Sequence, residues 1–338
     1  MVIDYRSDTV TKPGKAMLEA MMAAPVGDDV FGEDTSINEL EHMAASMFGM
    51  DAGLFCPSGT MTNQIAIKCH TQPGDEVICD ESSHIYQYEG GGIAFNSGAS
   101  VKLIIGDRGR ITSKQVEEGI NPDDYHRART SLVSLENTSN RGGGSCYDFQ
   151  EILKIQDVCK RHKLALHLDG ARLWNALVAK NETAKQYGEV FDSISICLSK
   201  SLGCPVGSVL LGEQNFIRRA RRIRKAFGGG MRQAGFLAAA GIFALQNNID
   251  RLADDHSHAR KIAGAIEQKG FTSFVLPVET NIIIFELKEG LSAPDLVEKL
   301  KEHNILGYAI SPIRVRLVVH LDITTRMVEE TIKCFSNL

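Results

Sequence analysis

The chain has 338 residues, of which 43% are hydrophobic and 23% are charged, with a formal net charge of -5 and a pI near 6.1. This balance is typical of a soluble globular protein with a large core, and the length favours two domains. The acidic balance provides no basic field for nucleic acid or anionic lipid, so a small-molecule partner is favoured over either of them.

The start of the chain, MVIDYRSDTV, lacks the basic and apolar regions of a signal peptide. No apolar run approaches the length of a transmembrane helix. The eight cysteines are scattered without CxxC pairs or metal-ligand spacing, which indicates reduced thiols and no dedicated metal cluster. We therefore expect a cytoplasmic protein that binds neither membrane nor nucleic acid.

Short β-rich runs alternate with helical periodicity, which predicts βα units around a largely parallel sheet. The first clear helix is expected to begin at Ser36, where Glu39 would complete a capping box, and to stop at Gly49. A second helix is expected from Asp148 to His162, directly before a strand. The seven predicted strands are Ala52 to Phe55, Glu76 to Cys79, Val101 to Ile105, Leu132 to Leu135, Leu164 to Leu168, Ser193 to Leu198 and Ser208 to Leu211.

The pattern of predicted helices and strands changes after three consecutive glycines at 228–230. Helical and strand patterns then alternate in a shorter α+β arrangement. We therefore predict two domains: a large α/β domain over residues 1–249, which includes the N-terminal segment, and a small C-terminal α+β domain over residues 250–338.

The most informative positions are a carboxylate and a lysine that follow two predicted strands. Asp169 ends one strand, at the edge where open α/β sheets bind ligands, and Lys200 lies just beyond another. A lysine that forms a Schiff base and a carboxylate that keeps the pyridine nitrogen protonated together suit pyridoxal phosphate. Alone, each has an ordinary explanation, because such an aspartate usually caps a helix and such a lysine is usually solvated.

Two further segments fit the same site. Ser58, Gly59 and Thr60 follow the strand that ends at Phe55 and open a predicted helix, so their backbone N–H groups form a candidate phosphate cup. His84 lies in a glycine- and hydroxyl-rich loop, DESSHIYQYEGGG, that should emerge at the same edge of the sheet. The alternative for His84 is a structural histidine.

Several long strings in the chain together resemble the low-specificity threonine aldolases, which are fold-type I pyridoxal-phosphate enzymes. The resemblance runs from Ser7 to about Asp322 and implies a mostly parallel seven-stranded sheet with helices on both faces, plus a smaller C-terminal α+β domain. The strings are RSDTVTKP, APVGDDVFGED, PSGTMTN, the His84 loop, SLENT, LHLDGAR, CLSKSLGCPVGS, RKAFGGGMRQAG and VRLVVHLD.

The resemblance also implies a role for each matching residue. Lys200 would be the Schiff-base lysine and Asp169 the partner of the pyridine nitrogen, while His84 would stack on the cofactor ring. The resemblance also implies phosphate binding by Ser58, Gly59 and Thr60, and binding of the substrate carboxylate by Ser7, Arg172 and Arg316, with Arg172 also near the cofactor. Lys225 and Arg232 would contact the substrate, either from the same chain or from a neighbouring subunit.

The implied reaction is the retro-aldol cleavage of L-threonine, L-allo-threonine and related β-hydroxy-α-amino acids to glycine and an aldehyde such as acetaldehyde, a step in amino-acid metabolism that forms glycine. His84 is the first candidate for the base, with His126 or a bound water as alternatives. Another fold-type I enzyme, such as a β-eliminating lyase or an aminotransferase, is the alternative function. A cofactor-binding protein without turnover would not need the carboxylate-binding arginines. The implied assembly is a homo-oligomer, a dimer of dimers with the active site at a subunit interface.

Two features depart from the resemblance or lie outside it. Phe31 stands where the family often has tyrosine, so a hydroxyl group is missing from the GDDVFG loop. Residues 141–145, RGGGS, are rich in glycine, which favours a mobile loop.

Overall fold

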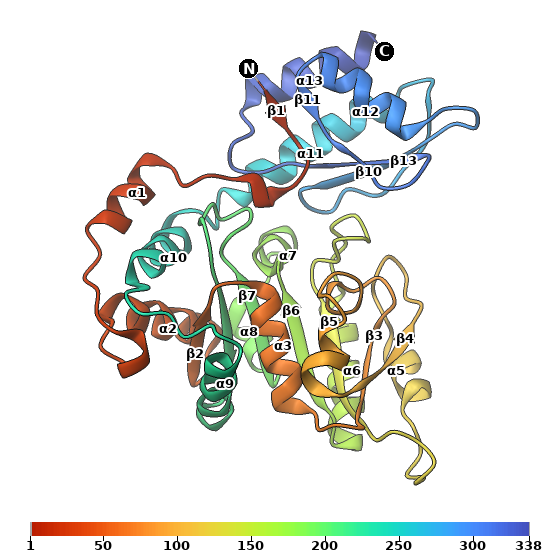
Figure 1. The fold of residues 1–338 in the computed structure, drawn as a ribbon. Helices are drawn as coiled ribbons and strands as arrows, with labels where there is room; N and C mark the ends of the chain where they lie inside the picture. Colours follow the sequence, from red (N-terminus) through yellow and green to blue (C-terminus); the bar gives the residue numbers. More distant parts are fainter. Residues whose placement is uncertain (1, 338) are drawn as a thin grey trace.

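The computed structural model describes residues 2–337 and contains a large α/β part and a smaller α+β part (Figure 1). The large part is built on a seven-stranded sheet in which β8 alone runs antiparallel to its neighbours. The predicted architecture and all seven predicted strands are therefore confirmed. In spatial order the strands are β2 (Ala52–Cys56), β8 (Ser208–Gly212), β7 (Ser193–Cys197), β6 (Ala165–Gly170), β5 (Thr130–Glu136), β3 (Glu76–Asp80) and β4 (Ser100–Ile104).

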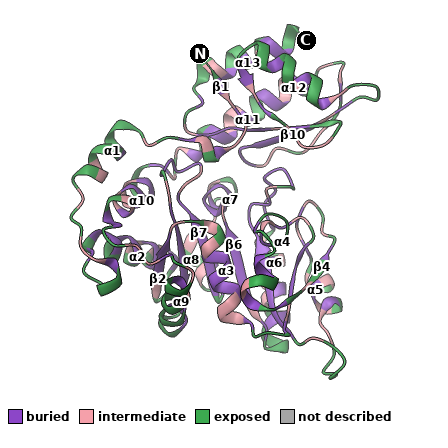
Figure 2. Ribbon diagram, viewed as in Figure 1, coloured by how far each residue is buried: buried purple, intermediate pink, exposed green. Residues whose placement is uncertain are grey.

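Helices cover both faces of this sheet, as predicted. Successive side chains of a strand point to opposite faces. In β2, Leu54 packs in a core cluster with α3 (Gly59–His70) and α9 (Gln214–Ala226), whereas Phe55 packs in the main cluster with α2 (Thr35–Phe48). The sheet is consequently buried from both sides, as Figure 2 shows. The other helices of this part are α1 (Lys15–Met22), α4 (His84–Gln87), α5 (Ser113–Gly119), α6 (Phe149–His162), α7 (Leu173–Lys180), α8 (Ala184–Gly188) and α10 (Gly235–Asn247).

Helix α2 begins earlier than predicted. Its N-cap is Asp34, whose carboxylate accepts a hydrogen bond from the Ile37 N–H at 3.1 Å. The predicted cap, Ser36, is inside the helix and donates instead to the Pro25 carbonyl at 2.7 Å. The prediction was wrong because aspartate is an equally good cap and sits at the position that fits the preceding loop. The predicted end at Gly49, which has a φ of 64°, is confirmed.

The smaller part is a four-stranded antiparallel sheet with helices packed on it. Its core is a separate cluster of buried side chains that includes Ile283, Leu317 and Phe335. In spatial order the strands are β12 (Tyr308–Ala309), β13 (Arg314–Val318), β10 (Ile282–Leu287) and β9 (Thr272–Val275), and the helices are α11 (Leu252–Glu267), α12 (Ala293–Glu302) and α13 (Thr325–Asn337).

The first residues of the chain pack with the last part of it. Strand β1 (Ile3–Asp4) pairs in parallel with β11 (Ile305–Leu306), and the fully buried Tyr5 shares a hydrogen bond of 2.9 Å with Thr331. The division at residue 249 remains a prediction, but this N-terminal strand lies with the C-terminal elements and not with the large sheet.

The glycine-rich segment 141–145 is tightly packed between the two parts. A side chain at Gly142 would lie 2.0 Å from the Arg108 carbonyl oxygen, and one at Gly144 would lie 2.3 Å from Thr280 Oγ1. Thr280 in turn donates a 2.8 Å hydrogen bond to the Gly144 carbonyl. Gly142 thus allows close packing within the large part and Gly144 close approach of the two parts, which corrects the interpretation of the segment as a mobile loop.

The eight cysteines are all free, and seven of them are buried. Within residues 2–337, no helix is both long enough and apolar enough to cross a membrane.

Candidate active site

Asp169 and Lys200 lie at the same edge of the large sheet, beyond neighbouring strands. Asp169 is in β6, is 2% exposed, and accepts hydrogen bonds from Asn63 Nδ2 at 2.9 Å and from the Ala171 N–H at 3.0 Å. Lys200 follows β7, and its Nζ lies 3.6 Å from Cys197 Sγ. The turn that carries it is held by Thr11, whose hydroxyl donates to the Lys200 carbonyl at 2.9 Å. The structure therefore brings together the two residues on which the sequence prediction depends.

The N-terminus of α3 reaches the same place. Ser58 caps the helix, because its hydroxyl accepts from the Met61 N–H at 3.2 Å. A side chain at Gly59 would lie 2.7 Å from Cys197 Sγ, so glycine is required for the helix to approach the strand that leads to Lys200. The free N–H groups of the first turn, at Gly59 and Thr60, are thus available to an anion beside the lysine.

His84 begins the short helix α4 and is surrounded by carboxylates. Its Nδ1 lies 2.9 Å from Glu89 Oε1, and its backbone N–H donates to Glu136 Oε2 at 2.7 Å. Burial alone would lower the pKa of His84, but the hydrogen bond to Glu89 and the charges of Asp169 and Glu136 raise it above its usual value. The imidazole is therefore held where it can exchange a proton near neutral pH.

The structure adds two buried glutamates to the predicted set. Glu89 accepts hydrogen bonds from Asn63 at 2.9 Å and from Gln64 at 2.7 Å. Burial and the nearby charge of Asp169 raise the pKa of Glu136 to about 7. Neither glutamate was predicted, although Glu89 stands in the His84 loop and Glu136 in the SLENT string.

The potential ligand atoms of His84, Glu89 and Asp169 lie within 4.8 Å of one another and could hold a metal ion. The sequence revealed no such cluster, because Asp169 is far from His84 and Glu89 in it. The same arrangement of buried carboxylates also suits the cationic nitrogen of a protonated aromatic ring.

Arg172 forms a buried ion pair that the sequence did not reveal. Its Nε and Nη2 each donate to the Asp8 carboxylate at 2.7 Å, and Ser201 donates to the same carboxylate at 3.1 Å. Although burial opposes it, the Arg172 and Lys200 charges hold the pKa of Asp8 well below its usual range. Asp8 thus accepts hydrogen bonds from two of the three nitrogens of the guanidinium that was predicted to bind substrate. Ser7, another predicted ligand, lies beside Asp8 and caps a short helical turn at Asp8–Val10.

Arg316 of β13 has an unsatisfied donor. Its Nη1 donates to Asn140 Oδ1 at 3.0 Å and its Nη2 to the Arg6 carbonyl at 3.2 Å. Its Nε is buried and has no hydrogen-bond partner among residues 2–337. Burial and the neighbouring Arg172 guanidinium lower the pKa of Arg316. An anion beside the two arginines would relieve both the missing hydrogen bond and the mutual repulsion of the guanidinium groups.

Three predicted residues are not part of this cluster within one chain. Lys225 is exposed in the last turn of α9, and Arg232 forms an exposed ion pair of 2.9 Å with Asp28. His126 is exposed in the loop between α5 and β5, where it pairs with Asp124 at 2.8 Å. This loop leads into the amino end of β5, the opposite edge of the sheet from Asp169.

Comparisons with known proteins identify similar sequences and similar folds. Residues 4–289 match the beta-eliminating lyase family. The chain is 44% identical to the low specificity L-threonine aldolase of Escherichia coli strain K12, over 97% of each chain. It is 42% identical to low-specificity L-threonine aldolase 1 of Arabidopsis thaliana, over 98% of this chain and 95% of that one. Among solved structures, a Leishmania major threonine aldolase superposes with a TM-score of 0.87 over 99% of each chain, at 22% identity.

Proposed function

The chain belongs to the beta-eliminating lyase family and, within it, to the low-specificity L-threonine aldolases, and from that premise we propose that it cleaves L-threonine and L-allo-threonine to glycine and acetaldehyde. The observation that carries the proposal is the unsatisfied Arg316 Nε, which lies close to Arg172 at the site that also holds Lys200 and Asp169. Two neighbouring guanidinium groups, of which only Arg172 is paired with a carboxylate, fit the α-carboxylate of an amino acid. We extend the proposal to related β-hydroxy-α-amino acids.

The residues present fit pyridoxal phosphate. In this proposal Lys200 holds the cofactor through its ε-amine, and Asp169 accepts from the ring nitrogen. Gly59 and Thr60, with the Ser58 hydroxyl, would bind the phosphate, and His84 would lie against the ring. When bound, the cofactor supplies an electron sink for the pair released from the Cα–Cβ bond of the substrate.

The other residues orient the substrate and move its protons. Arg316, the free Nη1 of Arg172 and the Ser7 hydroxyl fix the α-carboxylate, which sets the direction of the Cα–Cβ bond. His84 takes the proton of the β-hydroxyl while this bond breaks and acetaldehyde leaves. A proton then returns to Cα, and glycine is released. The buried carboxylates of Glu89 and Glu136 keep His84 in place and set its basicity.

Product analysis tests the proposed reaction. L-Threonine is expected to yield equal amounts of glycine and acetaldehyde, and only in the presence of pyridoxal phosphate. Ammonia with a keto acid would indicate β-elimination instead and would overturn the proposal.

Replacing Arg316 with glutamine is expected to raise KM for L-threonine by about 10- to 100-fold, which is the effect of losing one charge-assisted hydrogen-bond contact. Steady-state kinetics measure this, and kcat should change less than KM. Arg314→Gln is the matched control, because Arg314 lies on the same strand but pairs with Glu286 at the surface. Equal KM values for the two variants would remove Arg316 from the substrate site.

Replacing His84 with asparagine is expected to lower kcat by about 10²- to 10⁴-fold, the usual contribution of a general base. Because its pKa is raised, His84 stays protonated to a higher pH than an ordinary histidine. Activity of the wild type should therefore fall as the pH drops through this raised value, and the variant should lack that acidic limb. If the limb persists in His84→Asn and disappears in His126→Asn, the base is His126.

We also propose that the active unit is a homo-oligomer, a dimer of dimers. Three aromatic side chains are far more exposed than is usual for such residues: Phe31 at 72%, Phe95 at 89% and Tyr125 at 94%. His126 follows Tyr125, and Arg232 pairs with Asp28 in the loop that carries Phe31. His126 and Arg232, which lie away from the active site of their own chain, are thus next to exposed aromatic side chains that a second copy of the chain would cover.

Mixed oligomers test this arrangement. A Lys200→Ala chain and an Arg232→Ala chain should each be inactive alone, and co-assembly should restore activity because some shared sites regain both groups. Light scattering measures the size of the particle. A fully active monomer would contradict the proposal.

A further inference from the structure

A chain of polar side chains, buried except for the half-buried His70, runs beneath helix α3 from the active-site edge of the large sheet to its opposite edge. His167 and Asp169 are on the same face of β6, and Ser193 faces His167 from the start of β7. All three are at most 2% exposed. Asn63 and His70, from the second and last turns of α3, complete the set.

These side chains are linked by consecutive hydrogen bonds. His70 Nε2 lies 2.8 Å from Ser193 Oγ, which lies 2.8 Å from His167 Nδ1. His167 Nε2 lies 3.2 Å from Asn63 Oδ1, and Asn63 Nδ2 lies 2.9 Å from Asp169 Oδ2. Four hydrogen bonds therefore connect His70 to the carboxylate at the centre of the active site.

The direction of each hydrogen bond follows from the two carboxylates at one end. Asn63 Nδ2 must be the amide nitrogen, because it faces both Asp169 and Glu89 at 2.9 Å. Its oxygen then accepts from His167, which must carry its proton on Nε2. The unprotonated Nδ1 of His167 accepts from the Ser193 hydroxyl.

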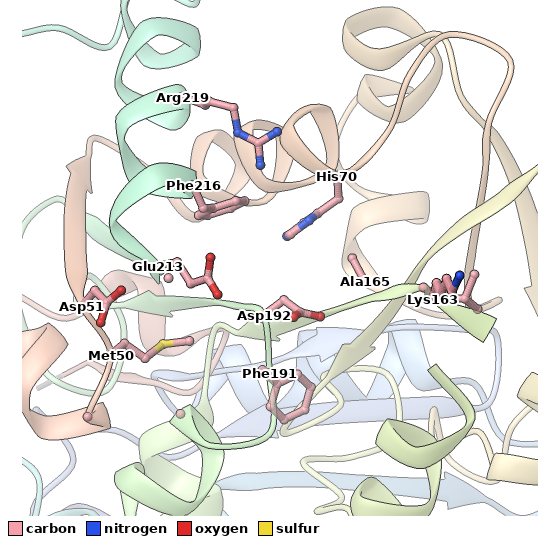
Figure 3. Close-up of a pocket in the computed structure, with 14 residues that line it drawn as sticks. Met50, Asp51, His70, Lys163, Ala165, Phe191, Asp192, Glu213, Phe216 and Arg219 are labelled. Carbon is pink, nitrogen blue, oxygen red and sulfur yellow. The ribbon is translucent and has the colours of Figure 1, made fainter. Parts of the chain in front are cut away.

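At the His70 end of this hydrogen-bond chain, the protons are donated in the same direction. Since the Ser193 proton is directed at His167, its oxygen accepts from His70, whose proton is also on Nε2. His167 is fully buried and its two ring nitrogens face Ser193 Oγ and Asn63 Oδ1, so no carboxylate within residues 2–337 pairs with the ring to favour a charged imidazole. Burial also lowers the pKa of His70 to about 4, so this imidazole is neutral near pH 7. His70 stacks on Phe216 at 4.7 Å, and both line a cavity of about 610 Å³ at the amino edge of the sheet (Figure 3).

We propose that His70, Ser193, His167 and Asn63 are positioning residues, which form a one-directional chain of hydrogen bonds that holds the Asp169 carboxylate in a fixed orientation. Each group donates toward Asp169, so each bond polarises the next in the same sense. The chain also prevents Asn63 from flipping its amide, which would turn an oxygen toward two carboxylates. The inference rests on the proposed function, in which Asp169 faces the ring nitrogen of the cofactor.

The first test reads the positions of the protons directly. In cofactor-free protein labelled with ¹⁵N at its histidines, NMR distinguishes Nε2–H from Nδ1–H tautomers, and His70→Asn and His167→Asn variants assign the two signals. Both His70 and His167 are expected to be neutral Nε2–H tautomers at pH 7. An Nδ1–H tautomer at His167, or a charged imidazole at either position, would overturn the proposal.

The second test interrupts the series of hydrogen bonds by removing one hydroxyl group. Ser193→Ala removes the hydroxyl between the two imidazoles, and the affinity of the cofactor-free protein for pyridoxal phosphate, followed by visible absorbance, is expected to fall about fivefold, the effect of one buried hydrogen bond. Ser195→Ala is the matched control. Ser195 is equally buried on the same face of β7, but its hydroxyl pairs with Thr62 at 2.6 Å, outside the chain.

The control separates positioning from stability. Both serine variants should lose some thermal stability. Only Ser193→Ala should bind the cofactor more weakly, and only in this variant should His167 no longer be held in the Nε2–H tautomer. Equal cofactor affinities in the two variants would overturn the inference. A wild-type protein that binds no cofactor would instead contradict the proposed function, and the tautomers in the cofactor-free protein would still be readable.

Discussion

Replacing Lys200 with alanine is expected to lower threonine cleavage by at least about 10⁴-fold, the scale of loss when a covalent catalyst is removed. The fold should survive, because Thr11 and the Gly203 N–H bind the carbonyl of residue 200, which the substitution leaves in place. The side chain itself has one hydrogen-bond contact among the described residues, with Cys197. The variant should also lack the visible absorbance that the wild type gains with pyridoxal phosphate.

Borohydride reduction followed by peptide mapping identifies the attachment site independently of turnover. The cofactor should be found on the peptide that contains Lys200 in the wild type and in the control variant Lys225→Ala. Label on Lys225, or on any other lysine, would refute the assignment of Lys200.

Replacing Asp169 with asparagine is expected to lower kcat by about 10²- to 10³-fold, a loss comparable with removal of a single preorganised electrostatic group. The carboxylate has two oxygens, which accept from Asn63 and from the Ala171 N–H. Asparagine has one oxygen, so it would leave one of these donors unsatisfied and would also lose the charge that attracts a protonated ring nitrogen. Cofactor should still bind, since the phosphate cup and Lys200 are unchanged.

Asp192→Asn is the control for this variant. Asp192 also supports β6, because it accepts from the Leu166 N–H at 2.7 Å, but it does so at the opposite edge of the sheet. Steady-state kinetics should show near wild-type kcat for Asp192→Asn. A wild-type kcat for Asp169→Asn would remove this carboxylate from the reaction centre.

The seven strands of the large sheet were predictable because each is a short apolar run bounded by turn residues. The polar layer beneath α3 was not predicted, although its signal is present in the sequence. In Ser193–Cys197 the order Ser-Ile-Ser-Ile-Cys alternates, and the serines face α3 while Ile194 and Ile196 join the main core on the other face. An alternating strand in the centre of a sheet covered on both faces indicates buried polar groups, and therefore hydrogen-bond partners on the covering helix.

The residues that the sequence could not supply are those whose roles depend on distant partners. Asp8 is an ordinary acidic residue until the fold brings it to Arg172, and Glu89 and Glu136 gain their roles from burial beside His84. The position of His126 was equally undetermined, because a loop residue can face its own site or that of a neighbouring chain. Local patterns predict elements, whereas pairs separated by 50 or more positions, as between His84 and Glu136, are fixed by topology.

The pairing of β1 with β11 has a consequence for biosynthesis. Ser7 and Asp8 enter the active site directly after Tyr5, which is anchored to Thr331 and whose carbonyl accepts from the Val318 N–H at 2.8 Å. A nascent chain on the ribosome can form the large sheet early, since its strands end at residue 212. The docking surface of the N-terminal segment consists of β11, Val318 and Thr331, so it is complete only after the residues near 331 have been synthesised and have emerged. Activity should therefore appear only late in translation, when the two ends of the chain close on each other, and a ribosome stalled before that point should carry a folded but inactive large domain.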